Sequence, residues 1–490
     1  MRRRKRGRKQ NKALNALSKI IAVIAIIIAI IFCVYVYRLD MLPTKYLTTV
    51  FLVLATIYLI LSLFAFPKKI KKGLKVFSCI LFIIFSLIFG YGIKYVDKTI
   101  SFIDTINKEL NQQEEYKIKC LSDNKITKKE LNGKTIGVFK NVNYDKLVER
   151  LNKKYKVKVV EYTDAVKLFE DLDDGKIDAI IASDNIYELL TTELDYMKLE
   201  LITIDSIFVP IKVDKEETKI VNVINTPFNI YIAGGDAYGD INKVMNTDVN
   251  MIATVDVKNH KILLTSIPRD YYVVLPSFGE NAYDKLTHAG YHGVGESVKA
   301  IEKLLDIDIN YYAKVNFSTI EKIVDAIGGI DVDSDFSFRF YEPENNMDFT
   351  FTKGINHLNG RKALAFARER QGFADGDVQR VKNQQKVISA IINKITSSKT
   401  LVSKYTDLLD AISESFATSL DSKSINRIVK AQLNDMRGWD LESQNLVGID
   451  GSSNKCYSIP NINLYVMKQN PESVNTASKK IKDFINREDS

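Results

Sequence analysis

Long apolar runs and short polar connectors alternate over the first hundred residues. The run Ile20–Tyr37 has eighteen residues without a charge, which is about the minimum for a helix that crosses a bilayer. Similar runs follow at Tyr46–Phe66 and Val76–Ile93. The first run exceeds the apolar core of a signal peptide and lacks a small-x-small cleavage site, so we expect it to be retained. We therefore predict three transmembrane helices within residues 20–97.

Positive charge predicts the orientation of these helices. Residues 2–9 (RRRKRGRK) carry seven of the cations behind a net charge of +9, and the connector KKIKKG at 68–73 is also basic. Cationic loops stay on the cytoplasmic side, so residues 1–19 are expected to be a cytoplasmic tail of a multi-pass plasma-membrane protein. The larger C-terminal part is then extracytoplasmic. The tail is short and adjoins a span, so we expect no nucleic-acid partner.

The part outside the membrane begins with a polar stalk at residues 98–115, after which strand and helix patterns alternate. Such alternation favours a parallel sheet covered by helices. We therefore expect a small α/β accessory domain over residues 116–211. Its expected strands are Lys134–Lys140, Tyr155–Tyr162 and Lys176–Ser183, and its expected helices are Tyr144–Lys153, Asp164–Leu172 and Asn185–Leu190.

A larger unit follows a charged linker and predicts a mixed-sheet α/β domain over residues 222–399. Helical periodicity returns after Lys399, so residues 400–490 are expected to be a helical extension packed on that domain. The overall fold class is α/β. The expected elements are strands at Phe228–Gly235 and within Asp248–Asp270, helices at Gly295–Leu304, Ser318–Gly328, Leu358–Ala367 and Val378–Lys394, and an extended segment at Arg368–Gln371.

The four cysteines indicate no disulfide framework. Cys33 and Cys79 lie in expected spans, while Cys120 and Cys456 lie outside and far apart in sequence. Only that last pair is a candidate bridge, and no spacing matches a zinc site.

A cluster of cations surrounds a Gly/Asp turn in FARERQGFADGDVQRVKNQQ, which begins at Phe366. Arg368 and Arg370 are two apart, so they would point the same way from an extended segment. Arg380 and Gln384 are four apart and would share a helix face. The planar arginine fork suits phosphate oxygens. The pattern fits a site for a diphosphate-like anion, and it fits a solvated charged face equally well.

Two further stretches place charge at strand ends, where α/β proteins bind ligands. Arg269 follows an apolar strand, Asp236 follows a strand and a glycine pair, and Asp248 precedes another strand. Two carboxylates near arginines suggest Mg²⁺, or another divalent cation, between the protein and phosphate oxygens. The alternatives are an exposed ion pair at a strand end and turn capping by Asp. No G-K-[ST] loop is present, so this is not a Walker site.

Histidines gather only in KLTHAGYHG, which holds His288 and His292. Either one is a candidate base or ligand, with structural hydrogen bonding as the favoured alternative. No Ser/His/Asp order supports nucleophilic-serine chemistry.

Several stretches in this order resemble the LytR-CpsA-Psr family, most closely its CpsA-like branch with several N-terminal spans. The resemblance covers about Asn222 to Ile395, and residues 134–190 look like the accessory domain of that branch. The matching stretches are GGDAYGD, TDVNMIATV, ILLTSIPRDYYV, DKLTHAGYHG, KVNFSTIEKIVDAIGGIDV, LNGRKALAFARER and DVQRVKNQQKVI.

The resemblance implies a membrane-anchored phosphotransferase. Such enzymes take a glycopolymer from polyprenyl pyrophosphate, such as capsular polysaccharide or teichoic acid, and join it to peptidoglycan through a phosphodiester. It implies catalytic roles for Asp236, Arg269 and Arg370, and metal binding by Asp236 and Asp248. Asp236 is also the candidate for accepting the proton of the attacking hydroxyl. The residues implied to hold the pyrophosphate are Arg269, Arg368, Arg370, Arg380 and Gln384.

Two positions depart from the family pattern, and two other functions remain open. Asn246 and Asn383 stand where relatives often have arginine, which would alter anion affinity or donor preference. One rival function is a hydrolase that splits the same diphosphate with water. The other is a non-enzymatic lipid or wall receptor that regulates envelope synthesis.

Overall fold

The structure, a computed structural model, divides the chain into two compact units. One contains residues 1–106 with 421–437, and the other contains 107–420 with 438–490. The described residues are all except 1, 107–112, 141–142, 184–185, 188–198, 211–218, 236–240, 242–245, 344–345, 374–375, 398–404, 413–414 and 487–490.

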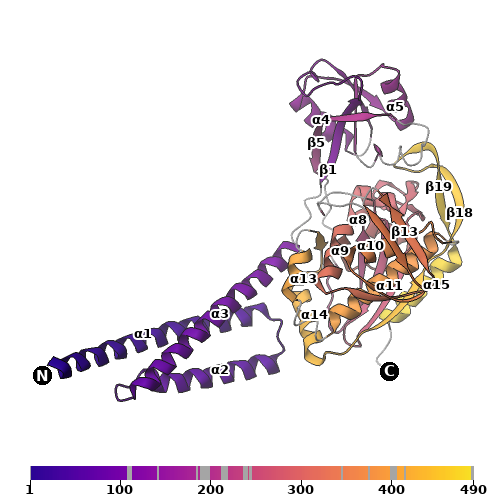
Figure 1. The fold of residues 1–490 in the computed structure, drawn as a ribbon. Helices are drawn as coiled ribbons and strands as arrows, with labels where there is room; N and C mark the ends of the chain where they lie inside the picture. Colours follow the sequence, from indigo (N-terminus) through magenta and orange to yellow (C-terminus); the bar gives the residue numbers. More distant parts are fainter. Residues whose placement is uncertain are drawn as a thin grey trace. The chain divides into compact units, whose positions relative to one another are not determined.

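The first unit contains the three N-terminal helices α1 (Arg2–Leu39), α2 (Thr44–Ala65) and α3 (Lys72–Ile106) (Figure 1). All three are long and apolar enough to cross a membrane, as predicted. Small buried residues such as Ala22 and Ala65 let the helices approach closely. The same unit includes α14 (Ser422–Asp435), which comes from far along the chain.

The accessory domain has a five-stranded sheet in the order β3-β2-β4-β1-β5. β2, β3 and β4 are parallel as expected, but β1 and β5 are antiparallel to their neighbours, so the prediction of a parallel sheet was wrong. β1 begins at Gln113, within the last residues of the predicted stalk. Its residues Tyr116, Ile118 and Cys120 alternate inward. The bounds are β1 (Gln113–Leu121), β2 (Thr135–Phe139), α4 (Tyr144–Lys154), β3 (Lys158–Tyr162), α5 (Ala165–Asp173), β4 (Ala179–Ser183) and β5 (Leu201–Pro210).

A six-stranded mixed sheet in the order β16-β11-β6-β7-β8-β17 forms the centre of the remaining part. β6, β8, β11 and β17 run in one direction, and β7 and β16 in the other. The bounds are β6 (Phe228–Gly234), β7 (Val249–Asp256), β8 (Lys261–Ile267), β11 (Tyr311–Val315), β16 (Phe416–Thr418) and β17 (Asp440–Asn445).

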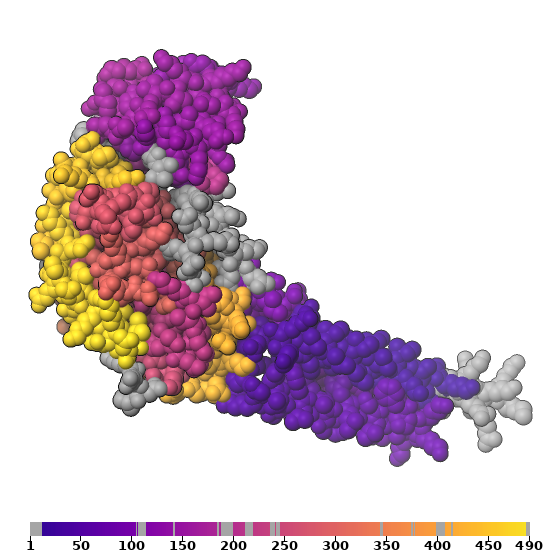
Figure 2. Space-filling model, turned by 180° about the vertical axis from the view of Figure 1, so that it is seen from behind, coloured from indigo at the N-terminus to yellow at the C-terminus, as the bar shows by residue number. Residues whose placement is uncertain are grey.

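Two apolar clusters form the layers around this sheet. One packs α8 (Val294–Leu305) and α15 (Pro471–Ile485) against buried strand residues such as Leu263. In Figure 2 the yellow C-terminal elements lie beside the salmon surface of residues near 300. The other cluster joins α10 (Gly360–Arg368) and α11 (Asp377–Thr396) to small paired strands. The remaining elements here are β9 (Tyr272–Val274), η1 (Pro276–Phe278), β10 (Tyr283–Lys285), α7 (Leu286–Ala289), η2 (Gly290–His292), α9 (Phe317–Ala326), β12 (Ile330–Ser334), β13 (Phe338–Glu342), β14 (Met347–Phe351) and β15 (Gly354–Leu358).

The C-terminal segment differs from the predicted helical extension. It contains α13 (Tyr405–Ile412), α14 and α15, but β16 and β17 also form the two edges of the central sheet, and β18 (Gly448–Lys455) pairs with β19 (Pro460–Gln469). The edge strand β17, with the sequence DLESQN, is polar and half exposed. It therefore lacks the alternating pattern by which strands are recognised. No disulfide forms within the described residues, where Cys120 is buried in the accessory core.

Candidate active site

The β7–β8 hairpin brings Asp248 next to Arg269. Its register pairs Asn250 with Ile267, so two residues further out Asp248 lies opposite Arg269. The Nη1 atom of Arg269 is 3.0 Å from Oδ1 of Asp248. Sequence reasoning had placed both residues at strand ends, and the antiparallel register is what makes them neighbours.

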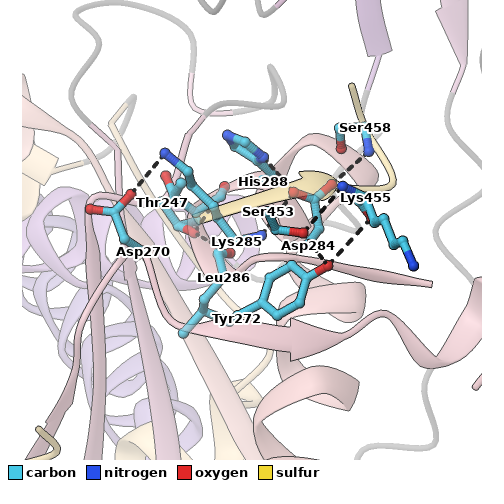
Figure 3. A network of polar contacts seen from close by, with 11 residues as sticks. Thr247, Asp270, Tyr272, Asp284, Lys285, Leu286, His288, Ser453, Lys455 and Ser458 are labelled. Atoms are coloured by element: carbon cyan, nitrogen blue, oxygen red, sulfur yellow. Dashed lines mark hydrogen bonds and ion pairs between the residues drawn. The ribbon is translucent and has the colours of Figure 1, made fainter. Parts of the chain in front are cut away.

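Two further ion pairs extend from Arg269 through Asp270 to Lys285. Nε of Arg269 is 3.5 Å from Oδ2 of Asp270, and Oδ1 of Asp270 is 3.2 Å from Nζ of Lys285 (Figure 3). The Lys285 side chain is only 5% exposed. Screening by water is weak in such a setting, so the position of each charge depends on its neighbour.

Backbone hydrogen bonds hold the segment after Lys285 against the pair. The amide of Thr287 donates to the carbonyl of Arg269 at 2.8 Å, and the amide of Thr247 donates to the carbonyl of Thr287 at 3.3 Å. Among the described residues, Oγ1 of Thr287 and Oδ1 of Asn246 are buried and have no hydrogen-bond partner. Buried polar atoms are normally satisfied, so these two oxygens are candidate donors to a bound group.

His288 has a structural role in the geometry of the described residues. Its Nδ1 lies 2.6 Å from Oδ1 of Asp284, which is fully buried and also accepts from the amide of Ser458 at 2.6 Å (Figure 3). Burial acts to raise the pKa of Asp284, but the His288 ring and Ser458 outweigh it and hold that pKa below its ordinary value. The network ties α7 to the loop between β18 and β19.

His292 is held neutral. Its ring packs on Phe278 at 4.6 Å between centroids and approaches Tyr457. Burial lowers the pKa of His292 to about 4, and its Nε2 is buried without a hydrogen bond. This geometry favours the structural alternative for both histidines of KLTHAGYHG.

Arg368 is fixed by a carboxylate and two rings. Its Nη2 and Nη1 atoms lie 2.7 and 2.9 Å from the two oxygens of Glu342. Its guanidinium lies over the Phe317 ring at 4.5 Å and near Phe340. Phe317 begins α9 just after β11, so Arg368 lies near the carboxyl end of that strand. Arg368 is the last residue of α10, so the predicted extended segment begins one residue later, at Glu369.

The residues of α11 approach the same edge of the sheet. Nε2 of Gln385 donates to Oγ of Ser266 at 2.9 Å, three residues before Arg269. Arg380 and Gln384, on the same helix, are buried, whereas Arg370 before it is exposed. Gln385 therefore brings α11 to the strand that leads to Arg269. The roles of Arg370, Arg380 and Gln384 as pyrophosphate ligands stay predictions.

Asn383, at a position where relatives often have arginine, forms hydrogen bonds that hold two helices together. Its Nδ2 donates to the carbonyl of Phe366 at 3.2 Å, and its Oδ1 accepts from Gln379 at 3.0 Å. Asn383 is 1% exposed. It therefore joins α11 to the end of α10, next to Arg368.

Asp236 lies outside the described residues, so its predicted role stays a prediction. Sequence reasoning missed four contributors to the site, because each depends on a partner distant in sequence. They are Lys285, Thr287, Phe317 and Glu342.

The described residues fit a Mg²⁺ ion that is held partly by substrate. They contain no group of three His, Cys, Asp or Glu that could hold a metal. Mg²⁺ commonly takes one or two carboxylates and completes its shell with waters and substrate phosphates. The Asp248 carboxylate and the unpaired buried oxygen of Asn246 are hard donors of the required type.

Comparisons with known proteins agree on one family. The LytR_cpsA_psr family model matches residues 205–477. The polyisoprenyl-teichoic acid–peptidoglycan teichoic acid transferase TagU of Bacillus mycoides (strain KBAB4) is 36% identical over 222 residues, which is 44% of this chain and 69% of the relative. TagU of Enterococcus faecalis (strain ATCC 700802 / V583) is 33% identical over 220 residues, with the same coverage of 44% and 69%. The crystal structure of TagV from B. subtilis matches 54% of this chain and 99% of that chain, with 26% identity and a TM-score of 0.45.

Proposed function

The chain belongs to the LytR_cpsA_psr family, and we propose that it is a membrane-anchored phosphotransferase that attaches a glycopolymer from polyprenyl pyrophosphate to peptidoglycan through a phosphodiester. Relatives that are 36% and 33% identical to it over 222 and 220 residues are named as teichoic acid transferases acting on peptidoglycan. The observation that carries the proposal is the Asp248–Arg269 pair at the sheet edge.

The diphosphate of the donor is negatively charged, and we expect the arginines at this edge of the sheet to bind it. Arg269 offers guanidinium N–H groups that can exchange their contact with Asp248 for phosphate oxygens. Arg368, Arg370, Arg380 and Gln384 would supply further donors. Neutralising the diphosphate allows an electron-rich oxygen to approach phosphorus and stabilises the charge that moves to the leaving group.

The transfer step balances without ATP. A sugar hydroxyl of peptidoglycan attacks the glycan-side phosphorus, and a new phosphorus–oxygen bond forms. The bond from that phosphorus to the bridging oxygen breaks, and polyprenyl phosphate leaves with the electron pair. The hydroxyl proton passes to a base, for which Asp236 is our candidate. The diphosphate bond itself supplies the driving force, which suits a site outside the cell.

Asp248 and Asn246 would hold the divalent cation proposed for this site. When bound, Mg²⁺ neutralises phosphate charge as a Lewis acid. Asp248 also orients Arg269 through its carboxylate. With a divalent cation bound, Asp248 would direct both that cation and the Arg269 side chain toward the substrate phosphates.

We also propose the orientation of the chain in the membrane. Three apolar helices anchor the N-terminal part, and the basic tail and the connector at 68–73 favour the cytoplasmic side. Three crossings then put the family domain outside the cell, where peptidoglycan is found. Capsular polysaccharide, teichoic acid or a related polymer is the proposed cargo.

The test uses the full chain in phospholipid nanodiscs with Mg²⁺, a polyprenyl-pyrophosphate-linked oligosaccharide and peptidoglycan fragments. Mass spectrometry should detect a conjugate that carries one phosphate, and Arg269→Ala should abolish it. Arg339→Ala is the matched control, because Arg339 forms an exposed pair with Asp348 at 2.7 Å on the exposed face of β13, opposite to the face of Phe340.

The same assay separates the rival functions. Released glycan phosphate without a conjugate would support the hydrolase. Donor binding without turnover would support the receptor, provided that a relative such as TagU is active under the same conditions. Either result would contradict the proposed transfer.

A further inference from the structure

The helix α14 is held at the turn between α1 and α2 (Figure 1). Nδ2 of Asn426 donates to the carbonyl of Leu39 at 2.8 Å, and Nζ of Lys430 lies 2.7 Å from Oδ1 of Asp40. Nζ of Lys45 donates to the carbonyl of Asn434 at 2.8 Å. Three contacts from successive turns of α14 therefore fix it to the ends of two transmembrane helices.

These contacts define which face of α14 points to the membrane anchor. Asn426, Lys430 and Asn434 are four residues apart, so they lie along one face of the helix. At 100° per residue, Lys423 and Arg427 fall within the same face. Both are exposed. The face of α14 directed at the span ends is therefore cationic.

Two tyrosines indicate how deep in the membrane α14 contacts the ends of α1 and α2. Tyr37 and Tyr46 lie within one turn of the ends of α1 and α2, and they are 68% and 48% exposed. Tyrosine is enriched at the level of lipid headgroups. Because Leu39, Asp40 and Lys45 lie beside these tyrosines in the chain, the partners of α14 are at headgroup depth.

We propose that the face of α14 carrying Lys423, Arg427 and Lys430 binds anionic phospholipid headgroups at this surface. Within the described part of the chain, Lys430 pairs with Asp40, whereas no ion pair is found for Lys423 or Arg427. Two exposed cations at headgroup depth are matched in charge by anionic lipid phosphates. Each is expected to contribute about 1 kcal/mol near such a surface.

The proposal is tested by cutting the full chain after it has assembled in vesicles. A protease site is introduced between Ile106 and Gln113, and retention of the C-terminal fragment is measured after cleavage by sedimentation. In vesicles with phosphatidylglycerol the fragment should stay bound. In vesicles of phosphatidylcholine alone, or in high salt, retention should fall about thirty-fold, because two contacts of about 1 kcal/mol are lost.

Lys423→Gln with Arg427→Gln should give the same loss in phosphatidylglycerol vesicles. The matched control removes two charges from exposed lysines elsewhere, Lys353→Gln with Lys479→Gln, and should leave retention unchanged. Thermal unfolding of each variant checks that it folds. Equal retention in both lipids, or no effect of the α14 variant, would overturn the proposal. No substrate is present, so the result is independent of transfer activity.

Discussion

Two arginine–carboxylate pairs lie near the same end of the central sheet and differ in how firmly they are held. Both carboxylate oxygens of Glu342 accept hydrogen bonds from Arg368, and the guanidinium of Arg368 stacks on the Phe317 ring. Asp248 contacts Arg269 through one nitrogen at 3.0 Å. The two arginines are almost equally exposed, at 25% and 24%, so accessibility does not explain the difference.

The difference assigns the two arginines different tasks. A bidentate, stacked arginine is pre-organised and loses little freedom when a phosphate arrives. Arg269 meets Asp248 through one nitrogen and not as a bidentate pair, and we take it as the better candidate for following charge that shifts during the reaction. We therefore expect Arg269 to act mainly on the transition state and Arg368 mainly on donor binding.

The largest expected effect comes from Arg269→Ala. Loss of a group that stabilises developing charge typically costs about 10²–10³-fold in kcat. We expect such a loss in the nanodisc transfer assay, with a smaller change in KM. A variant that changed KM alone would show that Arg269 only binds the donor and would remove the contrast between the pairs.

Low pH should reduce the free energy of unfolding through His292, independently of the two arginine–carboxylate pairs. The pKa of His292 is about 4 in the folded chain, below its ordinary 6.5, so the unfolded chain binds more protons between these values. The contribution of neutral His292 to the free energy of unfolding is fully present above pH 6.5. It decreases by about 3 kcal/mol as the pH falls toward 4. Denaturant unfolding should show this slope, and His292→Phe should flatten it. An unchanged slope in that variant would assign the acid sensitivity to other groups.

Asp248→Asn tests the proposed metal. Removing one carboxylate should raise the Mg²⁺ concentration needed for half-maximal transfer by about 10–100-fold. Binding of Mn²⁺ to the full chain with the donor diphosphate, followed by electron paramagnetic resonance, provides a readout apart from activity. Asp348→Asn, which removes a carboxylate from an exposed pair with Arg339, is the control and should leave Mn²⁺ binding intact. Equal metal affinity in the wild-type and Asp248→Asn chains would contradict the assignment.

Glu342→Gln should have the smallest effect on transfer. The amide keeps the shape of the carboxylate but removes its charge, so Arg368 loses its fixed orientation. We expect KM for the donor to rise by about tenfold, with kcat little changed, as measured in the same transfer assay. A fall in kcat comparable to that of Arg269→Ala would mean that the two pairs act alike.

The parts of the site that follow local patterns were predictable from sequence. Apolar runs separated by KNH predicted the two strands that carry Asp248 and Arg269, and amphipathic spacing predicted the helix that carries Arg380 and Gln384. The antiparallel pairing of a short hairpin then leaves little freedom in which residues meet. Function was indicated through motifs that together resemble one family.

Contacts between distant segments were not predictable in this way. Glu342 and Phe317 meet Arg368 from separate elements, and β17 joins β8 although its residues are polar. α14 has the pattern of an ordinary amphipathic helix, and its contacts with Leu39, Asp40 and Lys45 assign it to the membrane anchor. These arrangements depend on tertiary packing, which periodicity does not record.

The β7–β8 hairpin also determines which length changes the site can tolerate during evolution. Paired positions in an antiparallel hairpin have numbers that add to a constant, as they do for Asn250 with Ile267 and for Asp248 with Arg269. Insertions in the turn after Asp256 leave every pair intact. A single residue added within β7 or β8 would separate the two charges and turn one of them to the other face. Relatives should therefore vary in turn length, while their strands lengthen or shorten only together.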